Sequence, residues 1–280
     1  MIKFATENIR PFVRNMWKEC FDDNDEFLDL HFTYKYKNEN TLVYLDKGKS
    51  VASLQMFPYF IRFYNKKIPF YYLAGLCTLP EYRKKGYMAE LIHASHRVMA
   101  QRAIPLSILV PAEEWLFGFY EKYGYQQVFN GNNTEVPIKK ILNSSPDVET
   151  AYQIFDKQIQ NKDFYVQKDF EDFKIIVDEY KMDGCPTKYN LSAMACIIDD
   201  DYLLDIYNSQ RSYPNSPQII KEKKIFPTAY NIRQPNEDIL MVSDKHLLCR
   251  LLFGYKISEL EAPFPSIFME HNPVMNLMLE

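Results

Sequence analysis

A buried strand that runs into a basic, glycine-containing turn is the feature of this sequence that most constrains its fold. Residues Tyr71–Cys77 are nearly all apolar, which is typical of a central strand covered on both faces. The turn Arg83–Met88 follows, and the apolar spacing after it predicts a helix over Met88–Gln101. The first backbone N–H groups of a helix and its positive dipole end favour a bound phosphate. A strand, a basic turn and a helix in this order therefore predict a site for a phosphorylated cofactor.

Two alternatives for this turn stay open at the level of its residues. A charged surface turn with no ligand fits the spacing as well as a phosphate site does. The turn lacks the G-x-x-x-x-G-K-[ST] pattern of a nucleotide P-loop and the G-x-G-x-x-G pattern of a dinucleotide fold. The chain of 280 residues carries a net charge of −4, so its basic turn is a local feature and not part of a nucleic-acid-binding surface. We therefore expect no nucleic-acid partner.

The cellular compartment and the binding of a metal can be inferred from the cysteines, the histidines and the first residues. The five cysteines, an odd number, form no C-x-x-C pair, which indicates a reducing compartment and neither disulfides nor a zinc site. His93 and His96 lie three positions apart without an evident further ligand, so we expect no metal. The sequence opens without an apolar leader and has no apolar run near the ~18 residues of a membrane span. These features predict a cytoplasmic protein with no membrane partner.

Alternating strands and helices predict the fold class of the N-terminal half. The apolar spacing predicts helices over 9–20, 25–34, 88–101 and 115–123. It predicts strands over 41–46, 50–57, 59–64, 68–78, 106–110 and 126–130, with a hairpin turn at 65–67. This order predicts an α+β (α/β-like) fold, in which helices flank a mixed central sheet.

The segment Asn143–Pro146 combines turn-forming residues with a helix cap, and it is the expected boundary between two domains, 1–142 and 147–280. Beyond it the pattern predicts a smaller α+β domain. Its expected helices are 148–159, 168–182 and 245–253, and its expected strands are 189–198, 202–207, 226–233 and 239–242. Residues 202–208 fit the start of a helix equally well.

Two segments of the N-terminal half resemble the GNAT superfamily of N-acyltransferases. Thr78–Leu91 is similar to the acyl-CoA motif of that family, V-x-P-x-x-R/Q-x-x-G-x-G/A, with Pro80, Arg83 and Gly86 at matching positions. Phe119–Tyr125 resembles the F-Y-x-x-x-G-F segment of the same family. Two matches in the right order are more specific than either alone, and the resemblance covers roughly residues 1–138.

This resemblance implies a GNAT fold and an acyl-CoA site. In that family the pyrophosphate rests on backbone N–H groups of the basic turn, and the pantetheine arm pairs with the edge of the preceding strand. Met88 departs from the second small residue of the motif, which affects how closely the helix start can approach the pyrophosphate. Carried over to this sequence, the cofactor-binding residues are Leu76, Cys77, Thr78, Arg83, Lys84, Lys85, Gly86, Tyr87 and Met88.

Two residues near the second motif are candidate catalytic groups. By the resemblance, Tyr120 is the general acid, because a phenol with an ordinary pKa of about 10 stays protonated at neutral pH and can give its proton to a leaving thiolate. Packing of its own short helix is the alternative role of Tyr120. Glu113 precedes this helix, where its carboxylate could bind a cationic amine or could only favour the helix dipole.

The C-terminal half resembles Eis-type acetyltransferases, in which a GNAT domain precedes a sterol-carrier-protein-like domain. Lys245–Lys256 and Ser192–Asp199 carry this resemblance, and residues 147–280 are too few for the whole arrangement, so a shortened version is implied. In that group the terminal carboxylate reaches the active site. By this resemblance Glu280 is a third catalytic candidate, and covering apolar surface is the alternative role of the tail.

Together these features predict an acetyl-CoA-dependent N-acetyltransferase. It would move an acetyl group directly to a primary amine of a small molecule or peptide, in a ternary complex with Tyr120 as the general acid. A CoA-binding regulatory or interaction module without turnover is the alternative, because the motif concerns cofactor binding and only Tyr120 concerns chemistry. Assembly into a homo-oligomer is left open by the sequence.

Overall fold

The computed structural model describes residues 1–131, 137–183, 190–209, 217–221 and 239–276. Within these residues the strands are β1 (Ile2–Phe4), β2 (Thr41–Asp46), β3 (Lys49–Phe63), β4 (Lys66–Thr78), β5 (Leu106–Leu109), β6 (Gln126–Phe129), β7 (Val166–Gln167), β8 (Ala193–Ile197), β9 (Gln218–Lys221) and β10 (Ile239–Val242). The α-helices are α1 (Arg10–Phe21), α2 (Asp25–Tyr34), α3 (Tyr87–Gln101), α4 (Glu114–Glu121), α5 (Ile138–Asn143), α6 (Val148–Ile159), α7 (Phe170–Asp183), α8 (Asp200–Ser209), α9 (Lys245–Phe253) and α10 (Phe264–Ile267). In this part of the chain no helix is long and apolar enough to cross a membrane.

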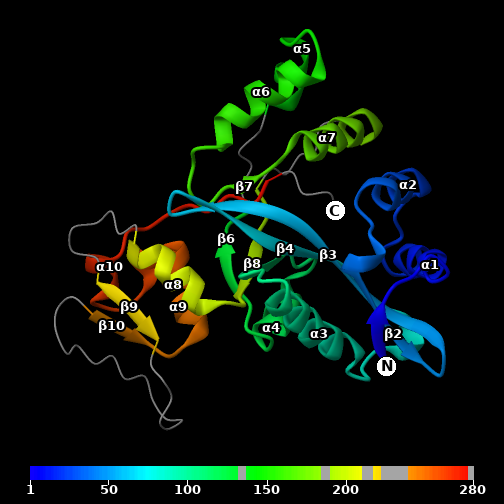
Figure 1. Ribbon diagram of the computed structural model, residues 1–280, viewed down its shortest axis with the longest axis horizontal. Helices are drawn as coiled ribbons and strands as arrows, with labels where there is room; N and C mark the ends of the chain where they lie inside the picture. Colours follow the sequence, from blue (N-terminus) through cyan, green and yellow to red (C-terminus); the bar gives the residue numbers. More distant parts are fainter. Residues whose placement is uncertain (132–136, 184–189, 210–216, 222–238, 277–280) are drawn as a thin grey trace.

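A mixed eight-stranded sheet forms the centre of the molecule (Figure 1). Its strands follow the order β1-β2-β3-β4-β5-β8-β6, and the short β7 pairs with the outer part of β3. Strands β1 to β4 are antiparallel, β4 and β5 are parallel, and β5, β8 and β6 are again antiparallel. The predicted α+β fold with a mixed central sheet is confirmed.

Helices cover both faces of this sheet. On one face α3 packs its buried Leu91 in the same apolar cluster as Leu42 of β2. On the other face α2 packs its buried Leu28 in a cluster with Val43, the next residue of β2. Neighbouring residues of a strand point to opposite faces, so this alternation separates the two cores. The sheet is therefore buried on both sides where α1 to α3 lie over it.

The hairpin of β3 and β4 is longer than predicted, because β3 runs unbroken through Pro58. Pro58 faces Tyr71 across the ladder, and four residues later the Arg62 N–H bonds outward to the Tyr165 carbonyl of the β7 segment. Residues an even number apart share a direction in a strand, so the missing N–H of Pro58 also faces outward. A proline on the outer edge removes no hydrogen bond from the ladder.

Strand β8 comes from the C-terminal half of the chain and lies inside the central sheet. It pairs with β5 on one side and β6 on the other, both antiparallel. The sheet therefore crosses the expected boundary at 143–146. That segment joins α5 to α6, and the two helices share one apolar cluster with Ile141 and Phe155 buried in it. The sterol-carrier-protein-like character of the C-terminal region stays a prediction.

The remaining C-terminal elements extend the core of the sheet. Helices α8 and α9 and the parallel pair β9–β10 bury Leu204, Leu252 and Val242 in one cluster with Ile61 of β3. In Figure 1 they lie at the opposite end of the molecule from α1 and α2. The predicted strand 202–207 is wrong, and the alternative helix is confirmed as α8. The predicted strand 226–233 lies outside the described residues.

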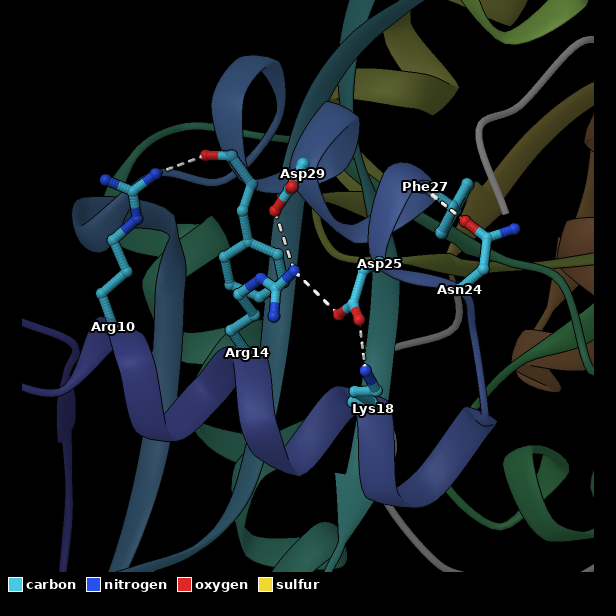
Figure 2. A network of polar contacts seen from close by, with 8 residues as sticks. Arg10, Arg14, Lys18, Asn24, Asp25, Phe27 and Asp29 are labelled. Atoms are coloured by element: carbon cyan, nitrogen blue, oxygen red, sulfur yellow. Dashed lines mark hydrogen bonds and ion pairs between the residues drawn. The ribbon is translucent and has the colours of Figure 1, made fainter. Parts of the chain in front are cut away.

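Helices α1 and α2 are joined by a surface network of charges (Figure 2). Arg14 of α1 lies 3.2 Å from Asp25 and 2.8 Å from Asp29 of α2, and Lys18 lies 2.6 Å from Asp25. Asn24 caps α2 by accepting the Phe27 N–H at 2.8 Å. Exposed pairs of this kind contribute little to stability.

Candidate active site

The edge of β4 that faces β5 is open at its C-terminal end. The two strands pair only over Tyr71–Leu73 and Ser107–Leu109. Over Ala74–Thr78, β4 pairs with β3 alone in the described part of the chain, because β5 has already ended. Unpaired backbone groups along a strand edge accept an added extended chain. The predicted pantetheine path along this strand thus corresponds to an available edge.

Thr78 directs its backbone polar groups to this open edge. The N–H of the next residue, Leu79, bonds to the Val51 carbonyl of β3 at 3.0 Å, so Thr78 faces away from β3. The Thr78 carbonyl accepts from Arg83 Nε at 3.1 Å and from Cys20 Sγ at 3.5 Å. The basic turn and the end of α1 therefore meet at one backbone group of β4.

A β-bulge at Gly75 bends β4 within this edge. Gly75 and Leu76 together oppose the single residue Leu54 of β3, where the register shifts. Gly75 has a φ of +57°, and a Cβ at this position would lie 2.3 Å from the ring of Trp17. Glycine is the only residue that satisfies both the positive φ and the close approach of the ring.

The basic turn ends in an uncapped helix start. Gly86 is the N-cap of α3 with a φ of +84°, and its side-chain position is open to within 4 Å. The Gly86 carbonyl accepts the Glu90 N–H at 3.1 Å, which begins the helical ladder. The preceding N–H groups of the first turn have no acceptor inside the helix. Free donors of this kind and the positive end of the helix dipole favour a bound anion.

Side chains of the turn point in different directions. The guanidinium of Arg83 uses Nε on the Thr78 carbonyl, and Lys85 lies over the ring of Tyr82 with Nζ at 4.7 Å from the centroid. The Tyr87 hydroxyl donates to Asp46 at 3.3 Å, away from the start of α3. Arg83, Lys84 and Lys85 are exposed. The turn thus offers cations and backbone donors, while the Tyr87 hydroxyl contacts the last residue of β2.

Tyr120 lies in the apolar cluster beneath α3 and α4. Its side chain is 6% exposed, and among the described residues its hydroxyl makes no hydrogen bond. Burial raises the pKa of this phenol well above its ordinary value. Tyr71 and Leu73, the last residues of β4 that pair with β5, belong to the same cluster. Tyr120 therefore keeps its hydroxyl protonated within the core that also contains the paired parts of β4 and β5.

The carboxylate candidates occupy different environments. Glu113 is the exposed N-cap of α4, and its carboxylate accepts from the indole of Trp115 at 2.8 Å. Glu114, the first residue of α4, is also exposed. The structure thus gives Glu113 a surface partner without placing it beside Tyr120. Glu280 lies outside the described residues.

The two histidines of α3 have packing partners. His96 Nε2 lies 3.1 Å from the Tyr125 hydroxyl, which in turn lies 2.6 Å from Ser107 Oγ on β5. The ring of His93 makes an edge contact with Tyr123. Burial lowers the pKa of His96 to about 4, so its imidazole is neutral at physiological pH.

Sequence reasoning missed a buried polar pair beside the bulge. His31 of α2 is fully buried against Trp17, and its Nε2 lies 3.2 Å from Gln55 Oε1 on β3. His31 Nδ1 and Gln55 Nε2 have no partner in the described part of the chain. Burial lowers the pKa of His31 to about 4. A histidine on the apolar stripe of a helix gives no sequence signal of such a pair, because Gln55 reaches it only through the tertiary fold.

Comparison with known proteins finds a family model and several solved structures that resemble this chain. The family model of the acetyltransferase (GNAT) domain matches residues 1–128. Eis1 from Mycobacterium abscessus aligns over 99% of both chains with a TM-score of 0.58 at 9% identity. A GCN5-related N-acetyltransferase from Anabaena variabilis, 18% identical, aligns over 63% of this chain and 47% of its own with a TM-score of 0.50. No curated protein matches the sequence.

A third structure, a probable N-acyltransferase from Enterococcus faecalis, is 18% identical and aligns over 46% of this chain with a TM-score of 0.41. The match covers 33% of the length of that protein, as it covers 47% of the Anabaena protein. At these identities the likeness to Eis1 and to the Anabaena protein shows a shared fold. The family model adds the domain to which the fold belongs, over the residues that contain the open β4 edge, the basic turn and Tyr120. Residues 1–128 of this chain match the family model of the acetyltransferase (GNAT) domain.

Proposed function

We propose that this protein is an acetyl-CoA-dependent N-acetyltransferase that moves an acetyl group directly to a primary amine of a small molecule or peptide. The observation that carries the proposal is the open edge of β4 over Ala74–Thr78, which leads directly into the uncapped start of α3 at Gly86. One extended arm ending in a diphosphate would satisfy both features at once. The CoA-bearing donor has this shape and charge.

Each part of the proposed donor has a counterpart in the chain. The pantetheine arm adds to β4 as an extra strand beside Leu76 and Thr78. The diphosphate accepts from the first N–H groups of α3, and Arg83, Lys84 and Lys85 supply exposed positive charge around it. Cys77 contributes backbone to this strand, since its side chain is buried against Ser53 Oγ at 3.2 Å.

Tyr120 is the proposed proton donor to the leaving group. The amine nitrogen attacks the thioester carbonyl carbon, the carbon–sulfur bond of the tetrahedral intermediate breaks, and the thiolate takes a proton while the amine gives one up. Burial keeps the Tyr120 phenol protonated, so it can donate a hydrogen bond to the thiolate as negative charge develops there. Glu113 and the Glu280 terminus are proposed contacts of the cationic acceptor.

Cofactor binding is tested by two matched glycine variants. Gly86 and Gly48 both have positive φ, +84° and +86°, and neither has an atom within 4 Å of a built Cβ. Alanine at either position should therefore cost a similar ~1–2 kcal/mol of stability. Only Gly86→Ala places a methyl group where the diphosphate would approach. We expect its CoA affinity in titration calorimetry to fall at least tenfold, while that of Gly48→Ala stays within twofold of the wild type.

Turnover is tested by release of free CoA thiol from acetyl-CoA with polyamines, aminoglycosides and lysine peptides as acceptors. Thiol release that requires one of these amines, together with acetylated product by mass spectrometry, supports the proposed enzyme. CoA binding without acetylation of any acceptor favours the binding module that the sequence left as an alternative. If CoA neither binds nor raises the melting temperature, both functions are wrong.

A further inference from the structure

Two thiols that are distant in sequence meet at the C-terminal end of β4. Cys20, the penultimate residue of α1, is half-buried, and Cys77 of β4 is 3% exposed. Cys20 packs against the small apolar cluster formed by Met16, Cys77 and Leu79. Cys20 Sγ also lies 3.5 Å from the Thr78 carbonyl oxygen, and Cys77 Sγ lies 3.2 Å from Ser53 Oγ. One residue of the pair is thus partly exposed and the other is held in the core.

The surroundings of the pair make the two sulfurs chemically different. The hydrogen bond with Cys77 and the nearby Arg83 lower the pKa of Cys20 to about 7, against the opposing effect of partial burial. The contact with Cys20 and burial raise the pKa of Cys77 well above its ordinary value. The lowered pKa favours the thiolate of Cys20, the nucleophilic form, while Cys77 keeps its proton near neutral pH.

We propose that Cys20 and Cys77 are a peroxide-reactive thiol pair that closes to a disulfide beside the basic turn. The Cys20 thiolate attacks one oxygen of hydrogen peroxide, the O–O bond breaks, and a sulfenic acid and hydroxide form. The Cys77 sulfur then attacks the Cys20 sulfur and loses its proton, the S–O bond breaks, and water leaves. Over both steps the two thiols are oxidised by two electrons and one peroxide is reduced to two waters.

The other described cysteines lack this arrangement. Cys196 is buried, and burial raises its pKa to about 12. Cys249 is also buried, with its pKa raised well above the ordinary value. Each donates to a backbone carbonyl, Cys196 to Tyr123 at 3.7 Å and Cys249 to Ala195 at 3.6 Å. Reactivity toward peroxide should therefore concentrate at Cys20.

Closing the disulfide changes a group next to the basic turn. Cys20 now donates to the Thr78 carbonyl, which Arg83 Nε also contacts. A disulfide has no S–H, so that donation is lost and the end of α1 becomes covalently tied to β4. This consequence rests on the proposed function: the oxidised protein should bind CoA several-fold more weakly, because Thr78 and Arg83 belong to the proposed cofactor site.

Peptide mapping tests the pair directly on the full chain. The wild type is treated with a small excess of hydrogen peroxide, alkylated under denaturing conditions and digested with trypsin. Cleavage after Lys18, Lys35, Lys67 and Arg83 releases Cys20 in residues 19–35 and Cys77 in residues 68–83. We expect these two peptides to be joined in the oxidised sample and separated again by dithiothreitol. Free alkylated Cys20 and Cys77 after treatment of the folded protein would overturn the proposal.

Variants assign the roles within the pair. Cys20→Ser should abolish the cross-link, whereas Cys77→Ser should leave a sulfenic acid on Cys20 that dimedone traps. Cys196→Ser is the matched control and should leave the cross-link unchanged. Cys20 should be oxidised roughly ten times faster than Cys196, and equal rates would overturn the proposal. The mapping needs neither CoA nor an acceptor, so it stands or fails independently of the acetyltransferase assay.

Discussion

Replacing Gly75 by alanine tests whether glycine is required for the bulge in the open edge of β4. Two separate costs follow from the structure. A non-glycine residue at φ +57° loses about 1–2 kcal/mol. The new Cβ would also lie 2.3 Å and 2.6 Å from two ring carbons of Trp17, a buried and rigid side chain, and overpacking of this kind costs about 1–3 kcal/mol. The sum predicts a loss of about 2–5 kcal/mol in the free energy of unfolding.

Urea denaturation measures this loss, with Gly48→Ala as the matched control. Gly48 has a φ of +86° and no atom within 4 Å of a built Cβ, so alanine there should cost the backbone strain alone, about 1–2 kcal/mol. Gly75→Ala should cost less stability in a Trp17→Leu protein than in the wild type, because the clashing ring is gone. Equal costs for Gly75→Ala and Gly48→Ala would refute the steric argument, and additive costs in the double variant would refute the role of Trp17.

Three further predictions follow from buried titratable groups. Tyr120→Phe should lower kcat about 100-fold with CoA affinity within twofold of the wild type, whereas Tyr123→Phe should change neither; unchanged kcat would remove Tyr120 from the chemistry. Burial lowers the pKa of Lys168 to about 7 from 10.5. Between these two values the unfolded chain binds a proton that the folded protein lacks. The free energy of unfolding should therefore rise between pH 7 and 10 by up to about 5 kcal/mol. Lys168→Met should abolish this rise in urea titrations at several pH values. The pKa of His31 is lowered to about 4 from 6.5, so wild-type stability should fall by up to about 3 kcal/mol as pH drops through this window, and His31→Gln should show a shallower fall.

Helices with regularly spaced apolar residues and a matching N-cap side chain were predictable from the sequence. Helices α2, α6 and α9 begin and end at the predicted residues. Each begins after a side chain that accepts a hydrogen bond from its first turn, Asn24, Asp147 and Asp244. The cap and the apolar stripe agree there, so local sequence decides the outcome.

Local sequence signals gave a wrong prediction where the same residues are compatible with two kinds of local structure. The acidic run before Tyr202 reads as a turn between strands, but Asp199 accepts the Tyr202 N–H at 3.0 Å and starts α8. An aspartate favours a tight turn and a helix start for the same reason, its ability to bind a nearby backbone N–H. The predicted break in β3 at Pro58 failed because only the register of the ladder reveals which way a proline faces.

The candidate site also has a part that the sequence predicts and a part that only the tertiary fold creates. The strand, basic turn and helix are contiguous in sequence, and the structure places them as predicted, with Gly86 at the helix start. The contacts that shape the end of β4 come from afar. Cys20 reaches Thr78 across 58 residues, and His31 reaches Gln55 across 24. No single-sequence pattern encodes such pairs, because the packing of α1 and α2 on the sheet creates them.

The position of β8 between β5 and β6 has a consequence for how the protein is made. The acetyltransferase domain ends its family match at residue 128, but its sheet is completed only by residues 193–197. Until that strand has left the ribosome, the facing edges of β5 and β6 are unpaired and can pair with another chain. A fragment that stops at residue 142 would keep these edges permanently. The first half of this chain therefore depends on the second half to finish folding.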